Sequence, residues 1–482
     1  MEMHTPDWVR DAVFYQIFPD RFAKSERVER PGNVEPWDSL PTTHGYKGGD
    51  LLGVVEKLDY LEDLGVNALY FNPIFQSASN HRYHTHDYDR VDPMLGGNLA
   101  LAELLKEARA RGMKVVLDGV FNHASRGFFQ FSDILENGQK SPYLDWFHIQ
   151  KFPLNAYGQG ELGYAAWWNL PALPKFNTDT EMVREFLWRV GTKWLEFGID
   201  GWRLDVPGEI DDDDFWREFR RRCRNVDPDC YLVGEIWDDA QRWLRGDQFD
   251  AVMNYPLTRA VFGFVAKSLN EEQIKRCGYR HVPRLSAKAF AAEVEAIRLR
   301  YRPEVEGVQL NLLGSHDTPR VHTVLNGDEA AVRMAFLLQM TLPGAPCIYY
   351  GDEIGLSGNN DPYCRQGMPW SHREVWNLDL YTYLKDLIRL RQENRALRRG
   401  LFKTVFARGS LLIYARKDGQ TTFLVVINTS SKQRKLAINL DSDVIPEGFY
   451  QSVRGPLHLE LKGRHLTGLD IPAREGVLYS LV

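Results

Sequence analysis

Residues 183–205 read VREFLWRVGTKWLEFGIDGWRLD, and this stretch carries the pattern that decides the fold. Apolar side chains recur in it at helical spacing, at Val183, Phe186, Leu187, Val190 and Trp194. Such a stripe predicts an amphipathic helix, and Gly198 stands where a helix often ends in a left-handed residue. The apolar run 199–205 that follows predicts a short buried strand. The stretch is therefore one helix–glycine–strand unit.

The same unit recurs along the chain, with Gly65 and Gly112 separating a helical stripe from an apolar run. Eight apolar runs predict strands, at 13–18, 66–72, 114–121, 199–205, 231–236, 249–255, 308–313 and 346–351. Apolar strands that alternate with helices are typical of a parallel sheet covered by helices. We therefore predict an α/β fold, a closed (β/α)8 TIM barrel. An open sheet would favour a glycine-rich phosphate loop after the first strand, and FPDRFAKSE has none.

Two segments fall outside this alternation and set the predicted domain organisation. Residues 124–178 are rich in Gly, Pro, Asn and aromatic residues, and we expect them to form a subdomain inserted after the third strand. Past residue 399, Asp418-Gly419 lies between two β-rich runs, which predicts hairpins and a C-terminal antiparallel β-domain over 399–482. The barrel is then expected to occupy 1–123 and 179–398.

The composition indicates a large globular protein. The chain has 482 residues, 44% hydrophobic and 26% charged, with a net charge of −6. This excludes a disordered or collagen-like chain, and without a basic tract we expect no nucleic acid and no anionic membrane as partner. The N-terminus shows no secretory signal, and no apolar run is long enough to span a bilayer. Five scattered cysteines without a CxxC pair indicate a reduced, cytoplasmic protein.

Polar and charged side chains follow the predicted strands at the ends where barrel enzymes build their chemistry. These residues are Asp118, Asn122, His123, Arg203, Asp205, Glu235, His316 and Asp317. Two carboxyl groups about 5 Å apart can cleave a glycosidic bond with retention, one as nucleophile and one as acid. A third carboxylate can stabilise the positive transition state. Arg203 precedes Asp205 by two residues, so both face the same side of a strand and the guanidinium can keep the carboxylate ionised.

Four segments carry a resemblance: DGVFNH (118–123), GWRLDV (201–206), GEIW (234–237) and LLGSHD (312–317). In order and position they resemble the signature segments of the α-amylase family of glycoside hydrolases. The resemblance implies that Asp205 is the nucleophile, Glu235 the acid/base and Asp317 the transition-state stabiliser. It also implies a set of sugar-contacting residues, with Tyr83 as a stacking platform: His81, Tyr83, His123, Arg203, His316, Asp361 and Arg365.

Finer features are similar to the neopullulanase, maltogenic amylase and cyclomaltodextrinase group. LPKFN (173–177) resembles the MPKLN-type marker of that group, which implies that Glu209 and Trp237 line the leaving-group side of the site. Members of the group carry a further N-terminal β-domain, and we expect none here because only about a dozen residues precede the first strand. The oligomeric state therefore stays open. Trp167 and Trp168 are expected either to roof the cleft or to form the core of the inserted subdomain.

The sequence predicts no essential metal and no cofactor. Members of the group bind calcium in an oxygen-rich loop just after FPxRF, but here 23–38 reads AKSERVERPGNVEPWD, with Lys24 and Arg27 where oxygen ligands are expected. A second calcium site of α-amylases uses a histidine where this chain has Glu209. The run HRYHTHDYD (81–89) could suggest zinc, but we favour sugar contacts and loop hydrogen bonds.

The predicted function is retaining hydrolysis of α-1,4-glucosidic bonds in cyclodextrins and maltooligosaccharides, with pullulan as a further candidate and with some transglycosylation. One alternative is an α-glucosyl transferase or isomerase on the same scaffold. Another is a non-catalytic carbohydrate-binding protein, which is disfavoured because all three acids are present. The partner expected in each case is an α-glucan oligosaccharide.

Overall fold

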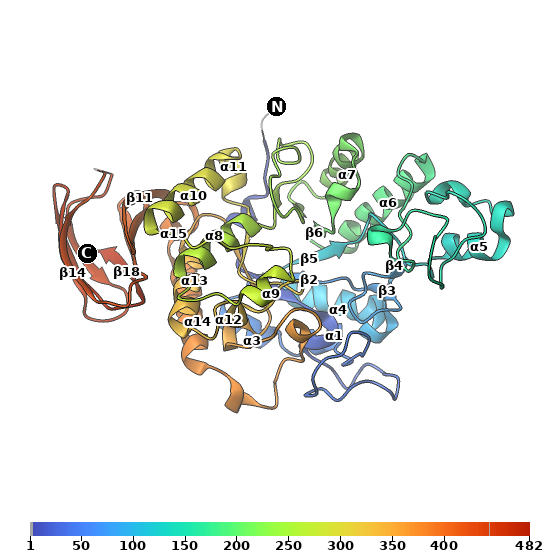
Figure 1. Cartoon of the computed structure of the whole chain (residues 1–482), viewed down its shortest axis with the longest axis horizontal. Helices are drawn as coiled ribbons and strands as arrows, with labels where there is room; N and C mark the ends of the chain where they lie inside the picture. Colours follow the sequence, from blue (N-terminus) through green and yellow to red (C-terminus); the bar gives the residue numbers. More distant parts are fainter. Residues whose placement is uncertain (1–2, 443) are drawn as a thin grey trace. The chain divides into compact units, whose positions relative to one another are not determined.

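The computed structural model describes residues 3–442 and 444–482, which form two compact units. Unit 1 comprises residues 3–6, 14–253 and 365–371, and unit 2 comprises residues 7–13, 254–364, 372–442 and 444–482. Figure 1 shows the chain coloured from blue at the N-terminus to red at the C-terminus and labels many of its helices and strands.

Unit 1 contains six parallel strands that pair in the order β8-β7-β6-β5-β2-β1. Figure 1 labels three of them, β6, β5 and β2. The strands are β1 (Phe14–Ile17), β2 (Ala68–Phe71), β5 (Lys114–Gly119), β6 (Gly201–Leu204), β7 (Tyr231–Gly234) and β8 (Ala251–Val252). The register pairs Asp118 of β5 with Arg203 of β6, and Arg203 with Val233 of β7. The residues that end these strands therefore lie at one edge of the sheet.

Helices alternate with these strands in the way the glycine pattern predicts. They are α1 (Pro19–Phe22), α2 (Leu51–Val55), α3 (Leu58–Leu64), α4 (Gly97–Ala110), α5 (Phe129–Asn137), α6 (Glu181–Phe197) and α7 (Asp213–Val226). Helix α3 ends at Gly65 with φ 93° and α6 at Gly198 with φ 118°, both left-handed. These backbone angles favour glycine, which explains why a glycine ends each of these two helices before the next strand.

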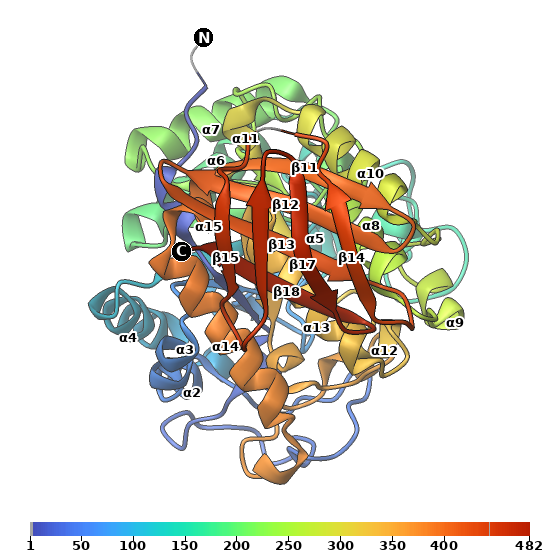
Figure 2. The same cartoon turned by 90° about the vertical axis from the view of Figure 1, so that its left-hand side faces the viewer.

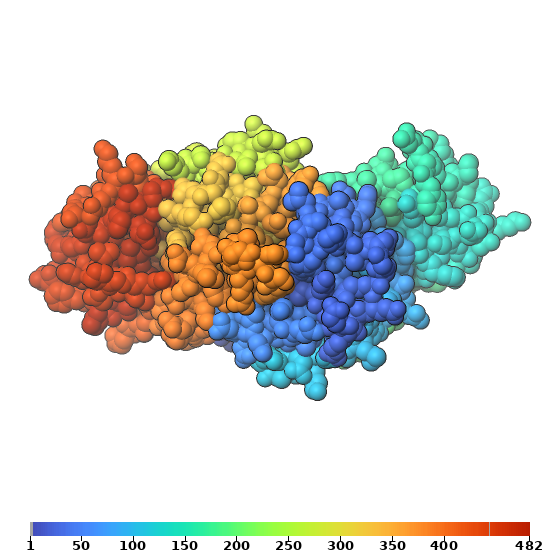
Figure 3. All heavy atoms as spheres, turned by 90° about the horizontal axis from the view of Figure 1, so that it is seen from below, coloured from blue at the N-terminus to red at the C-terminus, as the bar shows by residue number. Residues whose placement is uncertain are grey.

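The chain between β5 and α6 contains α5 and several single turns of 3-10 helix, η3 (Gly138–Lys140), η4 (Leu144–Trp146) and η5 (Trp167–Asn169). Aromatic rings pack at its centre, with Phe147 stacked on Phe176 at 5.4 Å and Phe128 edge-on to Phe176 at 5.5 Å. In Figure 3 these teal residues form a lobe beside the blue N-terminal part of unit 1. A short hairpin, β3 (Phe75–Ser77) with β4 (Thr85–Val91), precedes them and was not predicted.

Unit 2 contains the parallel pair β9 (Leu310–Leu312) and β10 (Ala345–Tyr349). Its helices are α8 (Tyr255–Val265), α9 (Glu271–Lys275), α10 (Ala287–Leu299), α11 (Pro303–Glu306), α12 (Val321–Val324), α13 (Glu329–Thr341), α14 (Leu378–Glu393) and α15 (Arg395–Arg399). The predicted strand 249–255 is shortened to β8, because the Asn254 side chain accepts a hydrogen bond from the Leu257 amide and so caps α8.

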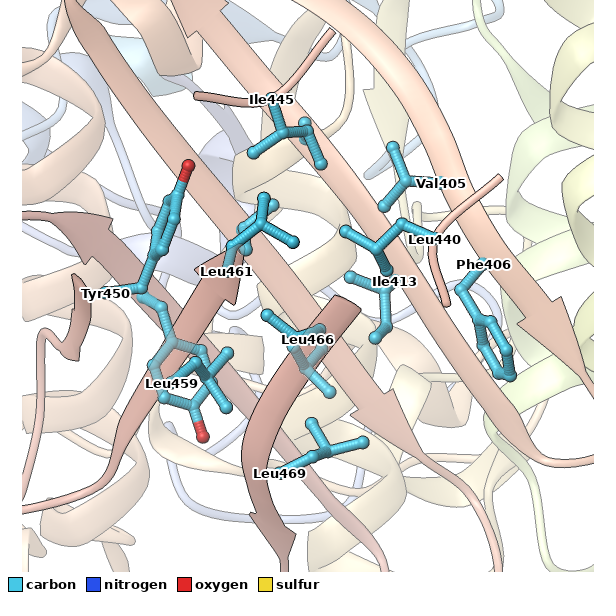
Figure 4. Close-up of a cluster of buried hydrophobic side chains, with 14 of the residues drawn as sticks. Val405, Phe406, Ile413, Leu440, Ile445, Tyr450, Leu459, Leu461, Leu466 and Leu469 are labelled. Atoms are coloured by element: carbon cyan, nitrogen blue, oxygen red, sulfur yellow. The ribbon is translucent and has the colours of Figure 1, made fainter. Parts of the chain in front are cut away.

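An antiparallel sheet follows α15 in the order β11-β12-β13-β18-β15-β16-β17-β14, and Figure 2 views it face-on. Its strands are β11 (Leu401–Arg408), β12 (Leu411–Asp418), β13 (Thr421–Asn428), β14 (Arg434–Asn439), β15 (Gly448–Ser452), β16 (His458–Lys462), β17 (His465–Ile471) and β18 (Glu475–Leu481). The predicted hairpin is confirmed: Asp418 pairs with Thr421, and Gly419 has φ 56°. Figure 4 shows the apolar core on this sheet, which includes Ile413, Tyr450 and Leu466.

Six parallel strands in unit 1 and two in unit 2 correspond to the eight predicted runs. They confirm the predicted α/β fold class, a (β/α)8 TIM barrel followed by an antiparallel β-domain. The domain boundaries named above stay a prediction. Among the residues that the structure describes, no helix is long and apolar enough to cross a membrane.

Candidate active site

Arg203 lies at the centre of a cluster of carboxylates in unit 1. Its Nη1 donates to Oδ1 of Asp118 at 2.8 Å and to Oδ1 of Asp205 at 2.9 Å, and its Nη2 lies 2.9 Å from Oε2 of Glu235. The three acids lie on or directly after the neighbouring strands β5, β6 and β7. The structure therefore brings Asp205 and Glu235 to one guanidinium, as expected from their positions at the strand ends.

The burial of this cluster makes its charges interdependent. Arg203 is fully buried, and the carboxylates around it hold its pKa well above the usual value against the effect of burial. Burial raises the pKa of Asp118, while the Arg203 guanidinium and two tyrosine hydroxyls oppose that rise. One guanidinium faces three acids, so with the acids ionised the cluster carries net negative charge. A cluster of this kind stabilises a positive charge that develops beside it.

Tyrosine hydroxyls orient Asp118. Its Oδ2 accepts hydrogen bonds from Tyr83 at 2.8 Å and from Tyr70 at 3.1 Å, and the Asn72 amide donates to the Tyr83 hydroxyl at 3.1 Å. His81 accepts the Tyr83 backbone N–H at 3.2 Å. Tyr83 and His81 were predicted, whereas Tyr70 and Asn72 were missed. Both stand at or just past the end of β2 with period-two spacing, which could have identified them.

Glu235 receives two further hydrogen bonds. The Val206 backbone N–H donates to Oε2 at 3.2 Å, and the Trp237 indole donates to Oε1 at 3.2 Å. Val206 adopts φ 35° and ψ 49°, a left-handed conformation that is rare for a β-branched residue. This strained residue directly follows Asp205, so one backbone turn orients both acids. Trp237 was predicted to line the site, whereas no signal in the sequence identified the role of Val206.

The other predicted residues of unit 1 have different environments, and that they line the same site as the Arg203 cluster stays a prediction. His123 is buried, its ring stacks on Trp167 at 5.4 Å, and burial lowers its pKa to about 3. Glu209 is partly exposed and pairs with Lys175 of the LPKFN segment at 3.1 Å. Arg365 is buried, with its guanidinium 5.6 Å from the ring centroid of Phe18.

Three predicted residues lie in unit 2. The Nε2 atom of His316, which is buried, lies 3.0 Å from Oδ2 of Asp317, whose side chain is 34% exposed. Asp361 is exposed and lies just before the single turn η8 (Tyr363–Arg365). His316 can therefore orient Asp317. That Asp317 meets Asp205 and Glu235 stays a prediction.

The loop 23–38, where members of the group bind calcium, is organised here around an arginine. The Arg30 guanidinium donates to the backbone oxygens of Ser25, Val28 and Gly48 and to the buried carboxylate of Asp50. A cation already occupies the oxygen-lined centre of the loop, so these residues do not fit a divalent ion. Within residues 3–442 and 444–482, no group of three or more His, Cys, Asp or Glu could hold a metal.

Comparisons with known proteins agree with this geometry. The model of a family described as "Alpha amylase, catalytic domain" matches residues 16–395. The chain is 46% identical to a cyclomaltodextrinase of Geobacillus thermopakistaniensis (strain MAS1), covering 91% of this chain and 72% of that protein. It is 44% identical to neopullulanase 2 of Thermoactinomyces vulgaris, with coverage of 90% and 72%. Among solved structures, the debranching enzyme from Nostoc punctiforme matches with a TM-score of 0.90 and 46% identity over 99% of this chain and 100% of that one.

Proposed function

Because the chain belongs to the alpha-amylase family of glycoside hydrolases, we propose that it hydrolyses α-1,4-glucosidic bonds in cyclodextrins and maltooligosaccharides with retention. The contact of Asp205 and Glu235 with one guanidinium is the observation that carries the proposal. Two acids bound to the same guanidinium are neighbours in the site, as the nucleophile and acid of a retaining enzyme must be. Some transglycosylation accompanies hydrolysis when a sugar replaces water as the acceptor.

In the proposed reaction, an Asp205 oxygen attacks the anomeric carbon while Glu235 gives its proton to the departing glycosidic oxygen. The resulting ester removes the negative charge of Asp205, which favours the ionised form of Glu235. Glu235 then takes a proton from water, and the hydroxyl attacks the anomeric carbon and releases Asp205. Two inversions at this carbon restore the α configuration.

The remaining residues are assigned to the substrate in this proposal. Asp317, oriented by His316, stabilises the positive charge on the sugar ring, and Tyr83 stacks on that ring. The other sugar contacts are His81, His123, Arg203, Glu209, Trp237, Asp361 and Arg365. The hydrogen bond from Trp237 to Glu235 supports its position on the leaving-group side.

A second candidate activity is cleavage of α-1,6 bonds. The similarity to a neopullulanase and to a debranching enzyme, each above 40% identity, favours it. The same acids would serve, because only the position of the departing hydroxyl differs. Initial rates on β-cyclodextrin, maltotriose, soluble starch and pullulan, measured side by side, separate the two activities. Panose from pullulan indicates α-1,4 cleavage, and maltotriose from pullulan indicates α-1,6 cleavage.

Azide rescue tests the two assigned roles. Asp205→Ala with azide is expected to release the β-glycosyl azide, because azide attacks directly from the face that Asp205 leaves vacant. Glu235→Ala with azide, on a substrate with an activated leaving group, is expected to release the α-glycosyl azide by way of the Asp205 ester. The same anomer from both variants, or wild-type rates without azide, would exclude the assignment.

We place the protein in the cytoplasm, with an α-glucan oligosaccharide as its partner. Each of the five cysteines is a free thiol, and four of them are buried, which supports a reducing compartment. Cell fractionation checks this placement.

A further inference from the structure

Trp168 combines two unfavourable properties. It is 78% exposed, the largest exposed fraction of any tryptophan that the structure describes. Its backbone has φ 50° and ψ 26°, and the next residue, Asn169, also has a positive φ of 57°. A left-handed conformation is unfavourable for a non-glycine residue, and strain of this kind is found most often at functional sites. Neither property contributes to a hydrophobic core.

The ring of Trp168 is nevertheless held in place by a stack. It lies nearly parallel to Trp167, at 4.7 Å and 12°, and Trp167 lies nearly parallel to His123, at 5.4 Å and 21°. His123 is buried and lies shortly after Gly119, the last residue of β5. The stack therefore runs from a residue assigned to the reacting sugar out to the protein surface.

The turn that carries these rings is fixed by backbone hydrogen bonds. The Trp167 amide donates to Leu173 at 2.9 Å, Asn169 to Ala166 at 3.1 Å and Leu170 to Trp167 at 3.0 Å. The Tyr164 hydroxyl also donates to the Pro171 carbonyl at 2.7 Å. A rigid turn presents the outer face of the Trp168 ring without further loss of conformational entropy on binding.

We propose that Trp168 is a stacking platform for a glucosyl unit of the substrate other than the one that reacts. This inference rests on the proposed function and adds a specificity residue to it. The C–H face of a pyranose ring is apolar and flat, so it packs on an exposed indole face and removes it from water. Trp167 separates Trp168 from His123, so the platform favours chains long enough to reach past the reacting sugar.

The test compares long and short substrates. Trp168→Ala is expected to raise KM for maltoheptaose about fivefold to tenfold, the loss of one aromatic stacking contact, with kcat and the rate on maltotriose changed by less than about twofold. Titration of maltoheptaose into Asp205→Asn, with and without Trp168→Ala, should show the same fold-change in Kd. Trp168→Phe should restore most of the affinity.

Two controls exclude a structural explanation. Tyr157, which is 76% exposed in the same inserted segment, packs on Arg126 and lies outside the stack, so Tyr157→Ala should leave KM unchanged. Trp168→Gly relieves the left-handed strain and should not lower the melting temperature, yet should lose the same affinity as Trp168→Ala.

The proposal would be overturned if Trp168→Ala and Trp168→Gly bound maltoheptaose as tightly as the wild type. It would also be overturned if they lost as much affinity for maltotriose as for maltoheptaose. The same loss in Tyr157→Ala would also overturn it. These results are distinguishable from a failure of the proposed function, since in that case the wild-type protein itself would hydrolyse no glucan.

Discussion

Two regions of unit 1 gather oxygen atoms around an arginine, and they differ in the kind of oxygen. Arg203 faces the carboxyl groups of Asp118, Asp205 and Glu235. Arg30 faces one carboxylate, Asp50, and three backbone carbonyls. At Arg30 one positive charge balances one negative charge, whereas at Arg203 the acids exceed the guanidinium.

The difference indicates that the Arg30 cluster stabilises the fold, whereas the Arg203 cluster is suited to catalysis. Burial raises the pKa of Asp50, and Arg30 with the amides of Ser25 and Gly53 opposes that rise, so the buried carboxylate is matched by the guanidinium beside it. The Arg203 cluster carries more acid than one cation can neutralise. This excess of negative charge is unfavourable for the folded protein without substrate. It becomes favourable when positive charge develops on the sugar ring during glycosyl transfer.

The largest expected effect contrasts an acid from each cluster. Asp205→Asn should lower kcat on β-cyclodextrin by at least about 10⁴-fold, because the amide cannot act as a nucleophile, with no loss in melting temperature. Asp50→Asn should do the opposite and lower the melting temperature while the folded enzyme keeps its kcat. Rates on purified, folded variants and thermal melts check both. Near-wild-type turnover of Asp205→Asn would contradict the assignment of the clusters.

The second-largest expected effect tests whether the planar shape of the Arg203 guanidinium matters for activity. Arg203→Lys keeps the charge but cannot contact Asp205 and Glu235 with separate nitrogens of one rigid plane, so the acids should separate. We expect kcat/KM to fall on the order of 10²-fold, as for a misplacement of about 1 Å. Arg217→Lys, on the exposed face of α7, serves as the control. Equal activity of Arg203→Lys and the wild type would show that only the charge matters.

A smaller effect, on stability alone, tests the Arg30 cluster. Arg30→Ala leaves Asp50 buried without its cation and should reduce the free energy of unfolding by about 3 kcal/mol. Arg27→Ala, which removes a more exposed pair with Glu103, should reduce it far less.

A chelator should leave the melting temperature of the wild-type protein unchanged. Arg30→Asp replaces the guanidinium with a carboxylate, so that only oxygen atoms surround the centre of the loop. The melting temperature of this variant should rise when calcium is added. A wild-type protein destabilised by chelator and restored by calcium would contradict the role of Arg30.

The smallest expected effect concerns His123, a buried histidine outside the two arginine clusters. Burial lowers the pKa of His123 to about 3, below its ordinary value, so the unfolded chain binds a proton at higher pH than the folded one does. His123 thus contributes stability that is present above about pH 6.5 and is lost as pH falls toward 3.

Between pH 7 and 5 the loss should be about 2 kcal/mol, and His123→Gln should flatten this part of the urea-unfolding profile. His148→Gln, at an exposed position in the inserted segment that follows His123, should not change it. A profile that is equally steep in His123→Gln would show that His123 is not the titrating group.

Sequence patterns identified much of the fold and part of the site. Helix–glycine–strand units located three of the parallel strands, because glycine takes the left-handed helix end easily, as at Gly65 and Gly198. Apolar runs located the other five. Asp118, Asp205 and Glu235 were identifiable for a similar reason: neighbouring parallel strands bring their carboxyl ends to one edge. The short strand β8 was misjudged in length because a polar cap, Asn254, lies within the apolar run.

By itself, the amino-acid sequence determined the order of the strands, the residues at their ends and the family that those residues resemble, since these depend on local periodicity. Only the tertiary structure decided that Arg203 contacts both Asp205 and Glu235, that Val206 is strained and that Arg30 fills its own loop. It also decided that Trp168 is exposed and not part of a core. Each of these depends on atoms brought together from distant parts of the chain, or on a backbone angle that no residue type at that position signals.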